Sequence, residues 1–181
     1  MRKHIHVWHL EITERHKIPA EELPRHYSLQ RLKARLPELL RFLYITVGAP
    51  WCWYVRLRWK YHDWLDRLED DRVEFWIAYI DGAPAGYFEL EIQLNHSVEI
   101  CYFGMAPDFI GQGHGKALLA DAIQKAWQLG AKRVWLHTCS LDHPSALDNY
   151  LKRGFVVFKE EDLVDDIPDT PIEPWTGAGK P

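Results

Sequence analysis

Alternating and periodically spaced apolar residues divide the chain into short strands and amphipathic helices. Apolar–polar alternation and runs of β-branched or aromatic residues predict strands, whereas apolar residues at helical spacing predict helices. Strands are expected at residues 4–13, 27–33, 73–80, 87–94, 98–105, 133–139 and 155–159, and helices at 37–47, 61–68, 116–129 and 144–153. The chain is therefore predicted to have a mixed α/β fold.

Turn residues indicate how the strands connect. Asp81-Gly82 is a hairpin signal, so the strands on either side of it should be antiparallel. Asn95-His96-Ser97 turns the chain again into strand 98–105. Strand 133–139 is reached through a helix and should therefore lie parallel to strand 98–105. The pattern predicts an antiparallel meander followed by a strand–loop–helix–strand unit.

The strongest chemical signal is the loop Ile110-Gly111-Gln112-Gly113-His114-Gly115-Lys116. Its alternating glycines permit unusual backbone angles and let main-chain N–H groups approach a ligand closely. The first N–H groups of a helix lack internal partners and attract anions, so the segment predicts a phosphate cradle. It is not a P-loop, because Ile110 stands where that motif needs glycine and Ala117 follows Lys116. The G-x-G-x-x-G dinucleotide spacing also fails.

These residues resemble the cofactor loop of the GNAT superfamily of acyl-CoA-dependent N-acyltransferases. The family pattern is Arg/Gln-x-x-Gly-x-Gly/Ala after a hydrophobic–x–Pro segment, which is Met105-Ala106-Pro107 here. Gly113 and Gly115 match the two glycines, whereas Ile110 replaces the usual Arg or Gln. The departure removes a polar side chain but leaves the N–H cradle.

A second motif supports the resemblance. Family members carry Asn-x-x-Ala-x-x-x-Tyr-x-x-x-Gly-Phe in a later helix. Ala146, Tyr150, Gly154 and Phe155 match this pattern, and His143 stands where Asn is usual. Two motifs in the right order and structural context make coincidence a poor explanation.

The resemblance implies the GNAT fold, a central, mostly antiparallel sheet that is flanked by helices and contains one parallel, splaying strand pair. It also implies that acetyl-CoA is the co-substrate. We expect an N-terminal strand and linker at residues 1–26, an N-acetyltransferase domain at 27–161 and a flexible acidic, proline-rich tail at 162–181. The expected cofactor contacts are Phe103, Gly104, Met105, Ile110, Gly111, Gln112, Gly113, His114, Gly115, Lys116, His143 and Asn149.

An amine acceptor is mostly protonated near neutral pH, so the reaction needs a general base. Glu99 is the first candidate, because some lysine acetyltransferases of the resembled superfamily place their base at the matching position. Glu89 and Glu91 on the neighbouring strand are alternatives, and His137 is a weaker one. The resemblance places Tyr150 beside the cofactor sulfur, as general acid.

Strand 98–105 should carry several of these groups. Simple alternation would put Glu99, Cys101, Phe103 and Met105 on one face. Main-chain N–H groups around Met105 are candidate oxyanion donors, with Gly104 permitting a local bulge that opens the strand.

Aromatic residues crowd the segment 51–64. The segment contains Trp51, Trp53, Tyr54, Trp59, Tyr61 and Trp64. Such rings can fill a core, or they can line a pocket for an apolar or aromatic group. In the resembled family the first two helices wall the acceptor site, so Trp51 and Trp53, together with Glu89, are expected to contact the acceptor. The other rings are expected in the core.

Three histidines near the N-terminus, His4, His6 and His9, raise the question of a metal site. No acid or cysteine partner at fixed spacing accompanies them. A solvent-facing edge strand is the preferred interpretation, and no metal is predicted.

Composition narrows the class of protein. The chain has 181 residues, 47% of them hydrophobic, with a net charge of -4 and no basic block, which disfavours nucleic acid as a partner. Three cysteines without C-x-x-C spacing fit a reducing cytoplasm. A signal peptide and an 18-residue apolar run are both missing from the sequence, so no membrane association is expected.

The sequence therefore predicts an acetyl-CoA-dependent N-acetyltransferase. Direct transfer to a primary amine of a small molecule is expected, and the aromatic segment favours an acceptor with an apolar or aromatic portion. A protein lysine or N-terminal amine remains an alternative acceptor, and a non-catalytic acyl-CoA sensor an alternative class. Family members are often dimers, so a homodimer is included among the expected partners.

Overall fold

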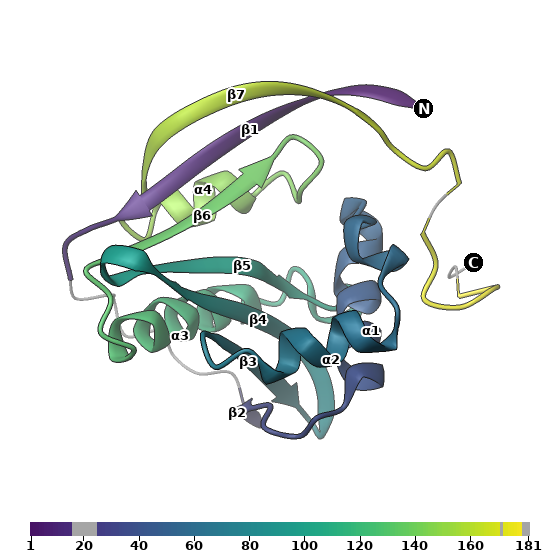
Figure 1. The fold of residues 1–181 in the computed structure, drawn as a ribbon, viewed down its shortest axis with the longest axis horizontal. Helices are drawn as coiled ribbons and strands as arrows, with labels where there is room; N and C mark the ends of the chain where they lie inside the picture. The colour runs from purple at the N-terminus through teal and green to yellow at the C-terminus, as the bar shows by residue number, and fades with distance from the viewer. Residues whose placement is uncertain (16–24, 171, 179–181) are drawn as a thin grey trace.

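The structure, a computed structural model, describes residues 1–15, 25–170 and 172–178. Seven strands form one mixed sheet in the order β2-β3-β4-β5-β6-β1-β7 (Figure 1). The strands are β1 (Arg2–Ile12), β2 (Tyr27–Arg31), β3 (Val73–Ile80), β4 (Ala83–Gln93), β5 (Ser97–Met105), β6 (Arg133–Cys139) and β7 (Val156–Asp166). The helices are α1 (Pro37–Gly48), α2 (Tyr61–Glu69), α3 (His114–Gln128) and α4 (Ala146–Leu151), with 3-10 turns η1 (Ala49–Trp51), η2 (Val55–Arg58), η3 (Leu94–His96) and η4 (Pro107–Phe109). The predicted mixed α/β fold is confirmed.

Helices cover both faces of the sheet because strand residues alternate between two cores. On β4, Phe88 packs in the core that α3 completes, whereas its neighbour Tyr87 packs in the core of α1 and α2. The α3 stripe of Leu118, Leu119 and Ala122 is fully buried against the sheet. This stripe follows helical spacing, which is why sequence periodicity predicts the helix.

The parallel pair β5 and β6 diverges after a short contact. Pairing covers only Ser97–Glu99 on β5 and Arg133–Trp135 on β6. Beyond these residues the two strands have no common ladder, which leaves a gap at their carboxyl ends. The expected parallel, splaying pair is therefore present, and it determines where the cavity forms.

A β-bulge in β5 overturns the predicted alternation of that strand. Glu89 of β4 faces Tyr102 and Leu90 faces Ile100, so the intervening Cys101 has no partner across the ladder. The extra residue shifts the pattern of faces. Phe103 and Met105 consequently pack on the α3 side, away from the face of Glu99. The bulge lies at Cys101 rather than at Gly104.

Gly104 is needed for helix packing rather than for a bulge. A Cβ atom there would lie 2.6 Å from Val47 Cγ1 of α1. The glycine thus lets α1 approach β5 closely.

The expectation that the N-terminal strand lies at a sheet edge is wrong. β1 pairs with β6 along Val7–Ile12 and with β7 along Arg2–Glu11, so it is an inner strand. The two strands run side by side as a ribbon that extends beyond β6 (Figure 1). Sequence patterning missed this because β7 is mostly polar and does not alternate clearly.

The C-terminal strand is longer than expected. β7 continues to Asp166, and Ile167 beyond it is buried, so residues 162–167 do not belong to a flexible tail. Cross-strand hydrogen bonds to β1 hold this acidic stretch in place. Of the N-terminal strand and linker expected at residues 1–26, residues 16–24 lie outside the described residues.

Candidate active site

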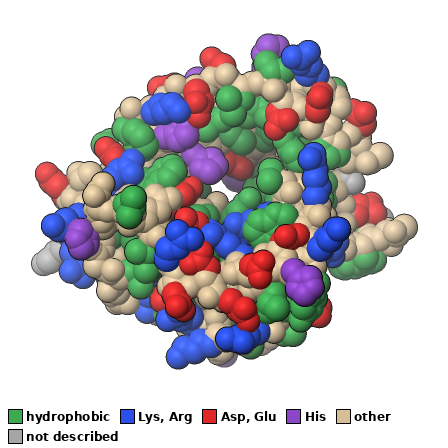
Figure 2. Space-filling model, in the orientation of Figure 1, with side chains coloured by type: hydrophobic (Ala, Val, Ile, Leu, Met, Phe, Trp, Pro, Cys, Tyr) green, Lys and Arg blue, Asp and Glu red, His purple; other side chains and the backbone are tan. Residues whose placement is uncertain are grey.

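A cavity of about 1330 Å³ opens where β5 and β6 diverge. Its walls come from the glycine loop, α4, the η1–η2 segment, β5, β6 and the β1–β7 ribbon. Figure 2 shows the hollow, with hydrophobic, acidic and histidine side chains around it. One cavity therefore joins elements that are far apart in sequence.

The glycine loop presents an open backbone surface to this cavity. Gly111 and Gly113 have φ values of +81° and +84°, and an added Cβ at either would meet no atom within 4 Å. Gly115 has ordinary angles, and an added Cβ would meet only Met105 Cγ at 3.8 Å. α3 begins at His114, directly after Gly113, so the amides of its first turn adjoin the open loop, with the Lys116 N–H bonded to the Gly113 carbonyl at 3.1 Å. Such a cradle could hold an anion such as a phosphate group.

Two of the predicted loop contacts involve side chains that do not line the cavity. Gln112 Nε2 donates to the carbonyl of Asp108 at 2.6 Å, and Gln112 Oε1 lies 3.3 Å from His114 Nε2. Their side chains brace the loop instead. Ile110 and Lys116, also expected to contact the cofactor, do line the cavity.

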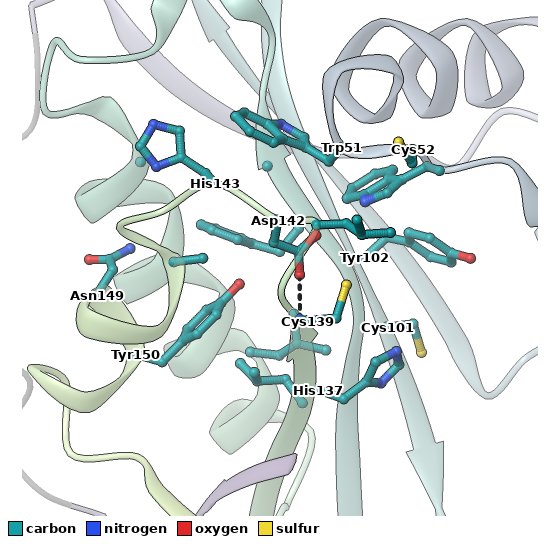
Figure 3. Close-up of a pocket in the computed structure, with 18 of the residues that line it drawn as sticks. Trp51, Cys52, Cys101, Tyr102, His137, Cys139, Asp142, His143, Asn149 and Tyr150 are labelled. Carbon is teal, nitrogen blue, oxygen red and sulfur yellow. Dashed lines mark hydrogen bonds between the residues drawn. The ribbon is translucent and has the colours of Figure 1, made fainter. Parts of the chain in front are cut away.

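The α4 region supplies a tyrosine at the centre of the site. The Tyr150 ring packs on Phe103 and Phe155, with centroids 6.2 and 6.1 Å away, while its hydroxyl points into the cavity (Figure 3). Burial raises the pKa of Tyr150, so the hydroxyl keeps its proton at neutral pH. The group can therefore donate a proton but is a poor base.

His143 and Asn149 also lie beside the cavity, on either side of the start of α4 (Figure 3). The His143 ring packs edge-on against Trp51 at a centroid distance of 5.1 Å. Asn149 Oδ1 accepts from Arg153 Nη1 at 2.5 Å. His143 thus ties the α4 turn to the η1 wall.

Glu99 and His137 form a pair across β5 and β6. Glu99 Oε2 accepts from Gln93 Nε2 at 2.8 Å, and Oε1 lies 3.6 Å from His137 Nδ1. The Glu99 side chain is 14% exposed and that of His137 is 50% exposed. The Glu99 carboxylate raises the pKa of His137, against an opposing effect of burial. The carboxylate is thus recessed, and the imidazole faces the cavity.

Glu89 is misplaced by the sequence prediction, because it does not line the cavity. Its side chain is fully buried, Arg56 binds both carboxylate oxygens at 2.5 and 2.8 Å, and Arg67 binds Oε1 at 2.5 Å. Arg67 also holds Glu91 at 2.6 Å. Glu89 is therefore a buried counter-ion beneath η2 and α2, which cannot contact an acceptor.

The aromatic segment divides between cavity, core and surface. Trp51 and Trp53 line the cavity. Trp53 also packs directly over Gly48, where an added Cβ would lie 2.3 Å from its ring.

Of the other rings in the aromatic segment, which were expected in the core, Trp64 is buried there, whereas Tyr54 and Trp59 line the cavity and Tyr61 is exposed. Trp59 and, from β5, Tyr102 also line the cavity, and their rings sandwich the Arg56 guanidinium at 4.5 and 4.3 Å from the ring centroids.

Several cavity residues were not identified from the sequence. Arg56 and Arg67 sit in the aromatic segment and α2 without any motif around them. His9, Glu161 and Asp165 come from β1 and β7, and their approach depends on the ribbon. The Tyr54 hydroxyl donates to Asp165 and joins the η1–η2 wall to that ribbon. No local sequence signal could have revealed these contacts.

Asp142 occupies the turn after β6. Its Oδ2 accepts from Thr138 Oγ1 at 2.7 Å and from the Cys139 N–H at 2.9 Å (Figure 3). These bonds fix the turn that carries the carboxylate between β6 and α4.

All three cysteines border the cavity as free thiols. Burial raises the pKa of Cys101 and of Cys139, so neither is a thiolate at neutral pH. Neither of these two is therefore activated as an acyl-accepting nucleophile.

No group of three or more His, Cys, Asp or Glu residues is arranged to hold a metal ion among residues 1–15, 25–170 and 172–178. Among the helices that these residues form, none has the length and apolarity to span a membrane.

The sequence is similar to known acetyltransferases. The family model described as acetyltransferase (GNAT) family matches residues 35–155. An uncharacterized N-acetyltransferase, MJ1207, of Methanocaldococcus jannaschii is 28% identical over 111 residues, 57% of this chain and 48% of that protein. The chain thus spans about half the length of this curated relative.

Solved structures share the fold. A GCN5-related N-acetyltransferase from Sphaerobacter thermophilus has a TM-score of 0.65 at 18% identity, covering 88% of this chain and 50% of that one. An aminoglycoside acetyltransferase, meta-AAC0020, from an uncultured soil metagenomic sample in complex with sisomicin has a TM-score of 0.60 at 16% identity, covering 71% and 88%.

Proposed function

The chain belongs to the GNAT family of acetyltransferases, and on that premise we propose that it transfers an acetyl group from acetyl-CoA directly to a primary amine of a small molecule. The observation that carries this proposal is the single cavity that joins three features. These are the open glycine cradle, the Tyr150 hydroxyl and the Glu99–His137 pair.

Acetyl-CoA fits the glycine-loop end of the cavity. Its phosphates would meet the amides of the first α3 turn, and Lys116 and Lys152 also line the cavity. Beyond Glu99, the β5 edge has no β6 partner, so its main-chain groups are free to pair with an amide-bearing pantetheine arm. The bound co-substrate supplies an activated thioester.

Side chains of the protein accept and donate the protons of the reaction. An ammonium acceptor must lose a proton before it attacks, and the Glu99–His137 pair is the acid–base unit that the structure presents to the cavity. The leaving sulfur is stabilised by a proton from Tyr150, whose hydroxyl remains protonated at neutral pH. The buried, protonated Cys101 and Cys139 favour direct transfer without an acyl-enzyme.

The acceptor end of the cavity favours a cationic amine with an apolar or aromatic portion. Trp51, Trp53 and Tyr102 supply aromatic walls. On the β7 side, Asp165 adds a carboxylate, and the Glu161 carboxylate is paired with Lys159 at 2.8 Å. The two arginines in this wall are balanced by Glu89 and Glu91, so they do not offset that negative charge.

Calorimetric titration of acetyl-CoA, CoA, ATP and NAD into the purified protein tests the proposal. We expect micromolar binding of acetyl-CoA and CoA, without binding of ATP or NAD. Release of free thiol on adding a primary amine would then establish transfer. Preference for ATP or NAD would overturn the cofactor, and tight acetyl-CoA binding without thiol release for any amine would leave a sensor as the function.

A further inference from the structure

The two members of the Glu99–His137 pair differ in what they can reach. Glu99 is recessed, with one carboxylate oxygen bound to Gln93 and the other beside His137. Gln93 is itself fixed, because its Oε1 accepts from Trp135 Nε1 at 2.9 Å. His137 is half exposed and borders the cavity. An acceptor in the cavity therefore meets the imidazole more readily than the carboxylate.

We propose that His137 is the catalytic base and that Glu99 is its positioning carboxylate. This inference rests on the proposed acetyl transfer and assigns its proton acceptor. With the proton on Nδ1 directed at Glu99, Nε2 of His137 keeps its lone pair for the acceptor. The 3.6 Å separation is an ion-pair distance that a small side-chain rotation would convert into a hydrogen bond.

The proton balance is complete with the groups already described. His137 takes one proton from the ammonium group, and the freed nitrogen lone pair forms the C–N bond as the C–S bond breaks. Tyr150 gives its proton to the sulfur and is restored by the second proton that the nitrogen loses. His137 then releases its proton to water, because it is half exposed.

The surroundings of His137 act on its pKa in opposite directions. Carboxylates from three neighbouring segments raise its pKa, and burial lowers it. The His9 ring lies 6.0 Å away and is itself bonded to Glu161 at 2.7 Å. The titratable groups that act on or pack against the imidazole are Glu99 from β5, His9 from β1, Glu161 from β7 and Asp142 after β6.

The neighbouring carboxylates on β4 cannot replace this pair. Glu89 is fully buried between two arginines, and Glu91 is bound to Arg67. Among the described carboxylates of β4 and β5, Glu99 is the one in ionic contact with a histidine. The acid–base unit is therefore built across β5 and β6.

Histidine titration by NMR tests the pair without any acceptor. In wild-type protein and in Glu99→Gln, the His137 ring signals are followed against pH. We expect the substitution to lower the pKa of His137 by about one unit, because it removes a negative charge and keeps the shape. Glu160→Gln is the control, since Glu160 bonds to His6 outside the cavity. An unchanged His137 pKa in Glu99→Gln would overturn the positioning role.

Kinetics with acetyl-CoA and phenethylamine, a primary amine with an aromatic portion, test the base. We expect His137→Gln to lower kcat/KM by about 100-fold or more with unchanged acetyl-CoA affinity. Glu99→Gln should lose only about 10-fold and move the acid limb of the pH profile to lower pH. His6→Gln is the control, because His6 also bonds to carboxylates but does not line the cavity.

The reverse pattern would overturn the proposal: loss of activity in Glu99→Gln, with His137→Gln nearly as active as wild type. Failure of the proposed function looks different. If wild-type protein binds no acetyl-CoA, or releases no thiol with any amine, the reaction itself is wrong, and His137 cannot be its base.

Discussion

Two glycines with the same backbone conformation can distinguish the cost of backbone strain from the loss of a ligand contact. Gly113 and Gly130 both have φ of +84°, and a Cβ atom added at either would meet no atom within 4 Å. Of the two, only Gly113 borders the cavity. Alanine at either position should cost about 1 kcal/mol of stability through its left-handed backbone. Only Gly113→Ala should weaken acetyl-CoA binding, by about 10-fold or more, because its methyl group enters the cradle.

Denaturant unfolding measures the stability of both variants, and calorimetry measures their affinity for acetyl-CoA. Equal acetyl-CoA affinity in Gly113→Ala and Gly130→Ala would remove the phosphates from this loop.

The Tyr150 hydroxyl is a second residue-scale test. Tyr150→Phe should lower kcat by about 100-fold, because the leaving sulfur loses its proton donor while the ring still packs on Phe103 and Phe155. Acetyl-CoA affinity should hardly change. Tyr61→Phe, on the exposed side of α2, is the control. A Tyr150→Phe enzyme with wild-type kcat would exclude the acid role.

Residue identity alone points to several residues that line the cavity and to some, such as Glu89, that do not. Tyr150, Gly113 and Gly115 follow from motifs, because their neighbours in sequence are also their neighbours in space. Glu89 and Glu99 look alike in sequence, as acidic residues on adjacent strands. They differ because two arginines from η2 and α2 cover Glu89.

At the level of elements, the buried ionic network fixes η2 and α2 to the sheet. Arg56→Ala should destabilise the protein by about 3 kcal/mol, because it breaks a buried pair and leaves Glu89 with less compensation. Urea unfolding measures the change. Arg72→Ala, which breaks an exposed pair with Asp70, should change stability little. Equal effects of the two substitutions would show that the network is not structurally important.

The bulge at Cys101 shows why an element can be predicted while its faces are not. Alternation correctly indicates strand 98–105, because most of its positions obey the period of two. One unpaired residue then exchanges the faces beyond it. Its position depends on the register with β4, which the strand's own sequence does not encode.

For the molecule as a whole, the β1–β7 ribbon closes one side of the cavity. The segment Arg2–His6 pairs only with β7 among the described strands, and Tyr54 reaches across to Asp165. A chain ending at Glu161 should therefore melt about 5 °C or more below a chain ending at Ile167. Thermal unfolding followed by circular dichroism compares the two. Equal melting temperatures would mean that the ribbon beyond β6 adds no stability.

The sequence by itself determines the order of elements, the glycine cradle and the motif tyrosine. Periodicity and turn chemistry act over a few residues, so local patterns suffice for these features. The tertiary structure decides that β1 is an inner strand, that β7 continues to Asp166, and that His137 faces the cavity beside Glu99. These outcomes depend on pairing between distant strands, where register and burial are set by the whole sheet.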